Sequence, residues 1–109
     1  MTLPYHFHSA LQELITIQPD SIVSRTFFED ETVKVVLFGF AAKQALSQHT
    51  SSKAAMLHIV SGDAQLTLGD NSYEVQSSAW VQMPPHLPHS VVAKTDMLML
   101  LYMLKGCPK

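Results

Sequence analysis

Residues 56–75 read MLHIVSGDAQLTLGDNSYEV. Two short apolar runs in this stretch end at the turn sequences Gly62-Asp63 and Gly69-Asp70-Asn71, and a third run, Ser72–Val75, follows them. Short apolar runs between glycine-containing turns are typical of antiparallel β-strands joined by tight connections. This stretch therefore predicts neighbouring β-strands.

The same pattern extends over most of the chain. Short apolar segments separated by turn residues occur at Ser21–Phe28, Thr32–Ala41, Ala54–Ser61, Ala64–Leu68, Ser72–Val75, Ala79–Met83, His89–Ala93 and Met97–Leu104. About eight short strands of this kind predict an all-β sandwich or barrel. The segment Ser9–Ile17 fits either a short helix or an edge strand, because its apolar residues match both spacings.

The length of 109 residues is typical of one domain. A chain of this size buries roughly two-thirds of its unfolded surface, which is enough for a core without disulfides. Its one cysteine, Cys107, cannot form an intrachain bridge. We expect an N-terminal arm over residues 1–20, packed on the barrel as a strand or short helix. A barrel over residues 21–105 and a C-terminal tail over residues 106–109 complete the predicted organisation.

The distribution of charge argues against several partners. The formal net charge is −2 and the seven Lys and Arg residues are scattered, which is not the pattern of a nucleic-acid surface. The first residues do not combine a basic segment with an apolar run, as a signal peptide does. The longest apolar stretch, Met97–Leu104, is far shorter than a membrane span. We therefore expect no nucleic acid, no membrane and a cytoplasmic location.

Two features predict a homodimer. Charged residues make up only 15% of the chain, which suggests that part of the surface is covered. The stretch Met97–Leu104 is apolar at almost every position, so a strand there needs cover on both faces. One face would meet the barrel interior and the other a second subunit.

Histidine is the residue type that points to a site. The chain has six histidines, His6, His8, His49, His58, His86 and His89. His49 and His89 lie near the ends of different predicted strands, and the hairpin region between them could bring those strands together. His6-x-His8 looks like a ligand pair, but it lies near a chain end, where we expect it at the surface.

Around His49 and His89 the sequence resembles the cupin family, in particular the small single-domain, RmlC-like proteins of the cupin-2 conserved-barrel type. The resemblance covers roughly residues 23–103. Gly39 and Gly62 frame the first family motif, and His49 falls on its first histidine. Pro84 and His89 match the proline and histidine of the second motif. The resemblance implies a double-stranded β-helix, or jelly-roll barrel, with its site inside.

Four positions depart from the family motifs. Ser51 stands where the second histidine of the first motif belongs, and Ala55 stands where its glutamate belongs. Ala93 and Ser77 replace the asparagine and the first glycine of the second motif. Two histidines therefore remain of the four metal ligands that the resemblance implies.

The resemblance implies one divalent metal, Zn, Fe, Ni or Mn, with His49 and His89 as ligands, because imidazole binds such metals well. A pair of core histidines without metal is the alternative, and the sequence leaves both open. His58 or His86 could supply a third ligand. Regular strand alternation would point His58 outward, and the turn position of His86 predicts a place on the rim.

The predicted interior is apolar, and small residues at two motif positions enlarge it. The expected pocket lining is Phe38, Phe40, Ser51, Ala55, Leu57, Ile59, Met83, Met99 and Leu101. Trp80, by contrast, is expected to be a packing residue. An apolar pocket with two imidazoles suits a small organic ligand, so we expect a binding protein. The alternative, implied by the family, is a metal-dependent enzyme of dioxygenase or isomerase type. A metal-free acid–base enzyme is a third possibility, and the sequence does not decide whether the protein is catalytic.

Overall fold

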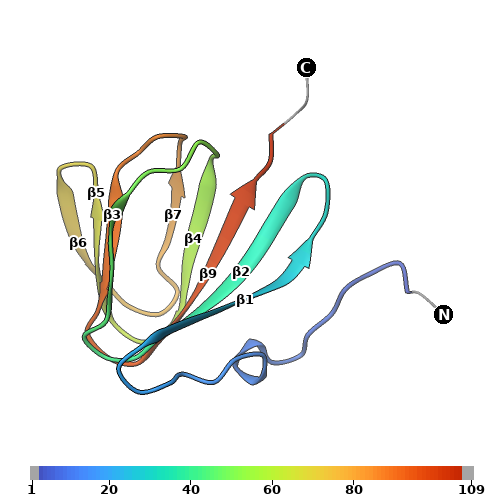
Figure 1. Cartoon of the computed structure of the whole chain (residues 1–109), viewed down its shortest axis with the longest axis horizontal. Helices are drawn as coiled ribbons and strands as arrows, with labels where there is room; N and C mark the ends of the chain where they lie inside the picture. Colours follow the sequence, from blue (N-terminus) through green and yellow to red (C-terminus); the bar gives the residue numbers. More distant parts are fainter. Residues whose placement is uncertain (1–2, 107–109) are drawn as a thin grey trace.

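The computed structural model describes residues 3–106, which form nine β-strands and one 3-10 turn (Figure 1). The strands are β1 (Ile22–Glu29), β2 (Val33–Phe40), β3 (Ala45–His49), β4 (Ala55–Ser61), β5 (Ala64–Leu68), β6 (Asn71–Val75), β7 (Trp80–Met83), β8 (His89–Ala93) and β9 (Met97–Leu104), and the 3-10 turn is η1 (Leu11–Glu13). The predicted C-terminal tail, apart from Gly106, and Cys107 lie outside the described residues.

The strands form two antiparallel sheets that face each other. One sheet has the order β1-β2-β9-β4-β7 and the other the order β3-β8-β5-β6, so the chain crosses repeatedly between the layers. The predicted all-β jelly-roll fold is thereby confirmed, and each of the eight predicted strands is present. The strand β3 was not among the predicted segments. All of its residues except Leu46 are exposed, so its sequence lacks the apolar pattern of a buried strand.

Most of the core lies between the two sheets. Alternate residues of β4, namely Ala55, Leu57 and Ile59, are buried there, and the intervening residues point to the outer face. The alternation follows from the pleat of a strand, which turns successive side chains to opposite sides. The buried members of this inner cluster are Phe40, Ala55, Leu57, Ile59, Ala64, Leu66, Met83, Val91, Ala93, Met97 and Met99.

A second apolar cluster lies on the outer face of the five-stranded sheet. Leu98 and Leu100 of β9 are buried there against residues of the N-terminal arm, among them Leu14 and Ile17. A Cβ built on Gly39 of β2 would lie 3.0 Å from Cγ1 of Ile17, so a side chain there would push the arm away. The second face of β9, for which a second subunit was expected, is thus covered at these positions by the same chain.

The N-terminal arm, predicted as a short helix or an edge strand, is neither of these over its full length. Between Ser9 and Ile17 only η1 is regular, and the remainder follows the sheet without strand pairing. The arm is held by its apolar side chains and by Arg25 of β1, whose Nη1 donates to the carbonyl of Leu14 at 2.8 Å. Tertiary packing therefore decides its path.

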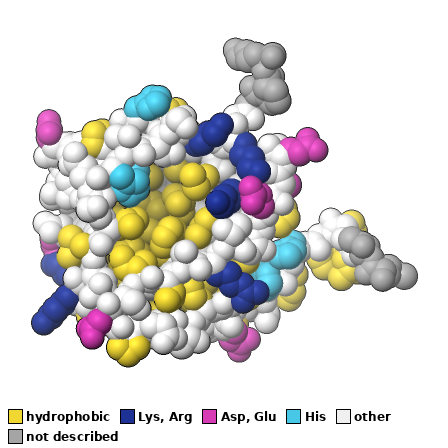
Figure 2. All heavy atoms as spheres, in the orientation of Figure 1, with side chains coloured by type: hydrophobic (Ala, Val, Ile, Leu, Met, Phe, Trp, Pro, Cys, Tyr) yellow, Lys and Arg dark blue, Asp and Glu magenta, His cyan; other side chains and the backbone are white. Residues whose placement is uncertain are grey.

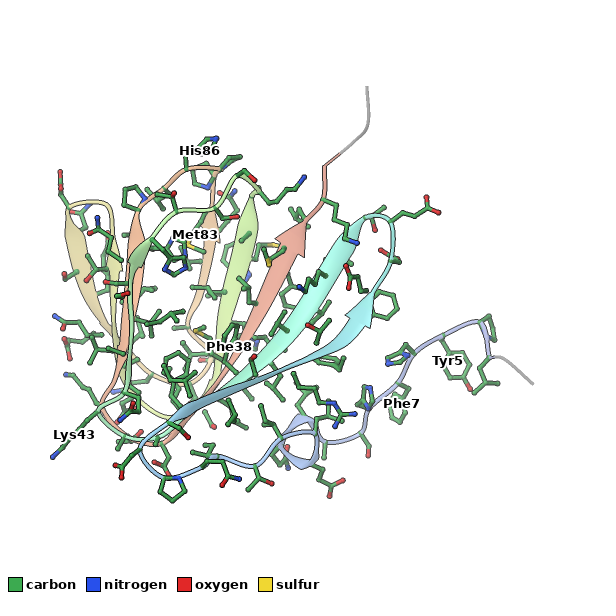
Figure 3. The ribbon with its side chains drawn as sticks, viewed as in Figure 1. Tyr5, Phe7, Phe38, Lys43, Met83 and His86 are labelled. Carbon is green, nitrogen blue, oxygen red and sulfur yellow. The ribbon has the colours of Figure 1, made fainter. Side chains whose placement is uncertain are left out.

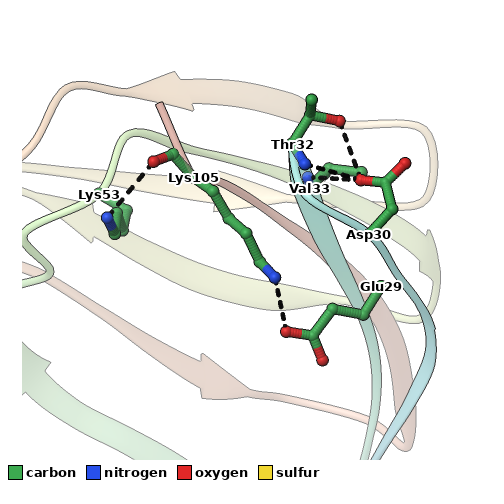
Figure 4. A network of polar contacts seen from close by, with 6 residues as sticks. All are labelled: Glu29, Asp30, Thr32, Val33, Lys53 and Lys105. Atoms are coloured by element: carbon green, nitrogen blue, oxygen red, sulfur yellow. Dashed lines mark hydrogen bonds and ion pairs between the residues drawn. The ribbon is translucent and has the colours of Figure 1, made fainter. Parts of the chain in front are cut away.

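The turn between β1 and β2 is closed by Asp30 (Figure 4). Its Oδ1 accepts hydrogen bonds from the backbone N–H and the hydroxyl of Thr32 and from the N–H of Val33, at 2.8, 2.9 and 3.0 Å. These bonds, first those from Thr32, lower the pKa of the Asp30 carboxyl. Next to this turn, Glu29 pairs with Lys105 at 2.8 Å, which lowers the pKa of Glu29 and ties the end of β9 to β1.

Over residues 3–106, no helix is long and apolar enough to cross a membrane.

Candidate functional site

A β-bulge brings His49 and His89 together. In the ladder between β3 and β8, Leu46 pairs with Val91, and a regular continuation would place Gln48 opposite His89. The register shifts between Leu46 and His49, so that His49 pairs with His89 instead. A bulge adds one residue to one strand and re-aims the side chains beyond it. Here the bulge turns the imidazole of His49, instead of the amide of Gln48, toward His89.

The two imidazole rings lie against each other at one end of the barrel. Their centroids are 4.1 Å apart and their planes are inclined by 59°. Nδ1 of His49 lies 2.8 Å from the carbonyl oxygen of Ser47, and Nδ1 of His89 lies 2.9 Å from that of Leu87. Because a carbonyl oxygen only accepts, each Nδ1 carries the proton in its bond. In the neutral imidazoles both Nε2 atoms therefore keep their lone pairs.

His89 belongs to the inner face of β8. It is 8% exposed, and Val91 and Ala93, which follow it at two-residue spacing, are buried in the inner cluster. His49 is exposed, so the pair runs from the rim of the barrel into its interior. Figure 2 shows apolar side chains gathered at the centre of this face of the molecule, with a histidine beside them.

The residues predicted to line a pocket fall into two groups. Phe40, Ala55, Leu57, Ile59, Met83 and Met99 are buried in the inner cluster, and Phe38 and Leu101 are half-buried and pack against it. Figure 3 shows Phe38 and Met83 between the two sheets. Ser51 is half-buried in the loop between β3 and β4, because β3 ends at His49 and β4 begins only at Ala55.

The two loops that carry the family motifs are tied together. The backbone N–H of His86 donates to the carbonyl of Ser51 at 2.7 Å. His86 occupies a turn with φ +70° and its side chain is exposed at the rim (Figure 3). His58 lies on the outer face of β4, next to Trp80 of β7 and Leu100 of β9. The structure thus brings His49 and His89 together, and it places the two candidate third ligands elsewhere.

The Nε2 atoms of His49 and His89 are suited to two positions in the coordination shell of a metal ion. Metal-binding histidines commonly donate their second ring N–H to a carbonyl, which orients the free nitrogen, and both histidines do so here. Within residues 3–106 no group of three or more His, Cys, Asp or Glu side chains is close enough to hold a metal ion. A metal bound by this pair would need its remaining ligands from water or from a small molecule.

One feature of the surface was missed from the sequence. A cavity of about 680 Å³ lies between the N-terminal arm and the outer face of the five-stranded sheet. Trp80, expected to pack, is instead 62% exposed on the same face, because it lies on the edge strand β7 beyond the reach of the arm. The alternation of Leu3, Tyr5 and Phe7 along the arm is the sequence signal that could have indicated an apolar surface there.

Comparison of the chain with protein-family models and with curated proteins gives no match. Solved structures do match it. A conserved Streptococcus pyogenes protein of unknown function is 26% identical, with a TM-score of 0.84, over 97% of this chain and 93% of that one. A cupin superfamily protein from Desulfitobacterium hafniense is 23% identical, with a TM-score of 0.84, over 95% of each chain. An RmlC-like cupin from Desulfovibrio desulfuricans is 25% identical, with a TM-score of 0.82, over 94% of this chain and 99% of that one. Over nearly its whole length, the chain has the jelly-roll fold of the small RmlC-like cupins.

Proposed function

We propose that this protein binds a small organic ligand at the mouth of the barrel, beside His49 and His89. The observation that carries the proposal is the hydrogen bonding of the two imidazoles. Each Nδ1 donates to a backbone carbonyl, so each neutral ring keeps its Nε2 lone pair for another partner. A nitrogen of this kind at the edge of an apolar interior provides the polar contact that orients a ligand.

The surroundings of the two rings favour one class of ligand. The inner cluster next to His89 is built from aliphatic, aromatic and methionine side chains, and among the buried residues of the described range 3–106 only His89 is polar or charged. Such a surface favours an apolar body, and the two Nε2 atoms favour a hydroxyl group that donates a hydrogen bond. Phenols and similar hydroxyl-bearing ring compounds combine both features.

We propose further that the same two Nε2 atoms can hold one divalent metal, of the type Zn, Fe, Ni or Mn, and that the ligand's oxygen then binds this metal in place of the imidazoles. Two histidines supply two donor atoms, and a ligand with oxygen donors would supply others. When bound, the metal would act as a Lewis acid toward the ligand's oxygen. His49 and His89 would hold it, and their carbonyl partners would keep the rings oriented.

Titration of the apo protein with Zn²⁺ and with phenol tests both proposals. Calorimetry should find one zinc site that is lost in His49→Ala and in His89→Ala, and nuclear magnetic resonance should show phenol shifting the signals of the same two rings. His86→Ala is the matched control, because this histidine is exposed at the same rim but lies outside the pair.

Two other outcomes would contradict these proposals. His6 and His8 have their Nε2 atoms 3.1 Å apart, so this pair is the alternative place at which zinc binding is tested. Zinc binding that persists in His89→Ala and disappears in His6→Ala would place the metal on the arm and contradict the metal proposal. Phenol shifts that are confined to arm residues would contradict the ligand proposal.

A further inference from the structure

The cavity of about 680 Å³ has the N-terminal arm on one side and the outer face of the five-stranded sheet on the other. Residues 3–8 and Leu11 supply the arm side, and residues of β1, β2 and β9 supply the sheet side. Binding pockets for small molecules have volumes of about 300–1,000 Å³. The cavity therefore has the size of a small-molecule site, and it lies outside the barrel interior that His89 faces.

A β-bulge in β1 places two phenylalanines on this side of the sheet. The register between β1 and β2 shifts between Thr26 and Phe28, so Phe27 is the extra residue of the bulge. Successive residues of a regular strand point to opposite faces. Here both Phe27 and Phe28 line the cavity and pack against the second apolar cluster. Bulges that re-aim side chains are frequent next to active sites, and this one doubles the aromatic surface of the cavity wall.

Aromatic residues also form much of the remaining wall. Tyr5 and Phe7 come from the arm, and Tyr102 comes from β9. Figure 3 shows Tyr5 and Phe7 on the part of the arm that projects from the barrel. Their side chains are 64% and 74% exposed, so a ligand can enter from the arm side. Because aromatic rings pack favourably on one another, a wall of this composition favours a flat aromatic ligand.

The charge that the walls can carry is positive. Among the described residues that line the cavity there is no Asp, Glu, Lys or Arg, and the phenol groups of Tyr5 and Tyr102 are of a type that is uncharged near neutral pH. His6 and His8 also line the cavity, and histidine becomes positively charged in weakly acidic solution. The walls therefore complement an anion and offer no opposite charge to a cation.

The two histidines can take up one proton without losing their contact. Nε2 of His8 lies 3.1 Å from Nε2 of His6, which is a hydrogen bond when one nitrogen carries a proton and the other keeps its lone pair. One further proton leaves this bond intact and gives both rings a protonated Nδ1. The pair then has one positive charge and two N–H groups that can donate to a carboxylate.

We propose that this cavity binds a small aromatic carboxylic acid in its anionic form. The aromatic body lies against the rings of Phe27 and Phe28, and the carboxylate accepts hydrogen bonds from His6 and His8. Each histidine ring has the centroid of a phenylalanine ring 5.4 Å from its own, so the charged and the aromatic parts of the site adjoin. The proposal does not depend on the proposed ligand site at the mouth of the barrel.

Calorimetric titration with naphthoate, an acid with two fused aromatic rings, tests the proposal, and naphthamide is the neutral compound of the same shape. At about pH 6 we expect naphthoate to bind more tightly than naphthamide, and at about pH 8 this preference should largely disappear. The expected ratio at the lower pH is about 10-fold, because a hydrogen bond to a charged group is roughly twice as strong as a neutral one.

Three variants separate the charge from the aromatic wall. His6→Asn/His8→Asn should remove the preference for the acid and leave the affinity for naphthamide nearly unchanged, which also shows that the cavity is intact. Phe27→Leu should weaken both compounds alike. His86→Asn is the matched control, because His86 lies at the rim of the barrel and does not line this cavity.

Several results would overturn the proposal. Absence of binding, equal binding of the acid and the amide at the lower pH, or a preference that persists in His6→Asn/His8→Asn would each do so. Naphthoate binding that weakens as the protein concentration is raised would show instead that a second copy of the chain fills the cavity. Zinc and phenol binding at His49 and His89 should be the same in the arm variants as in the wild type, so failure of this site and failure of the proposed function are distinguishable.

Discussion

Replacement of Gly62 by alanine should destabilise the barrel strongly. Gly62 joins β4 to β5 with φ +92°, in a region that residues with a Cβ rarely adopt. A Cβ there would lie 2.4 Å from the carbonyl oxygen of Asp96 and 2.9 Å from Cα of Met97. Both contacts are with backbone, so neither can be relieved by rotation of a side chain.

The expected loss of unfolding free energy in Gly62→Ala has two contributions. The left-handed conformation costs about 1–2 kcal/mol for a residue with a Cβ. Relief of the overlap requires that the β4–β5 turn moves away from the β8–β9 turn. That movement strains two hydrogen bonds, from the N–H of Asp63 to Oγ1 of Thr95 at 3.0 Å and from the N–H of Lys94 to the carbonyl of Asp63 at 2.8 Å. At about 1 kcal/mol for each bond, the free energy of unfolding should fall by about 3–4 kcal/mol in total.

Urea unfolding followed by circular dichroism measures this difference, and the melting temperature should fall by roughly 15 °C or more. Gly69→Ala is the control, since Gly69 also has a positive φ, +60°, but its nearest neighbour, Cδ1 of Leu87, would lie 3.8 Å from the new Cβ. This variant should lose only the conformational part, about 1–2 kcal/mol. If Gly62→Ala were as stable as Gly69→Ala, the close approach of the two turns would be disproved.

Two further predictions concern the arm and the acid stability of the fold. Gly39→Ala should lower the free energy of unfolding by about 1 kcal/mol, because the new Cβ crowds Ile17 and, less closely, Val23, and the loss should be clearly smaller in an Ile17→Ala background. Equal losses in both backgrounds would show that the arm does not pack there. Asp30 has a lowered pKa in the folded protein, so its contribution is present above the ordinary value of 3.8 and is lost as the pH falls through the lowered pKa. Asp30→Asn should therefore be less stable than the wild type at neutral pH, and the two should converge in acid when urea midpoints are compared. A constant difference at every pH would contradict this assignment.

The strands and their inner faces could be predicted from the sequence to a large extent. In β4 the alternation of Ala55, Leu57 and Ile59 with outward residues is a local property of the chain, because the pleat fixes which side chains share a face. The positions of the turns at Gly62 and Gly69 are local as well. The strand β3 was missed because a mostly exposed strand carries little apolar periodicity.

The candidate site could be predicted only in part. The resemblance to the family motifs indicated that His49 and His89 would meet, and their rings do lie in contact. Neither the bulge that places His49 opposite His89 nor the carbonyl partners of the two rings could be predicted. A bulge depends on the pairing of two strands that are distant in sequence, and the pattern of one strand does not reveal it.

The sequence by itself determined that this chain has an all-β fold with apolar inner faces, because strand periodicity and turn residues act over a few neighbouring positions. Only the tertiary structure decided that the N-terminal arm covers one half of the outer face, that Trp80 remains exposed on the other half, and that two imidazoles lie in contact at the mouth of the barrel. Those outcomes depend on which distant segments pack together, and packing depends on the shape and burial of the whole assembly of strands.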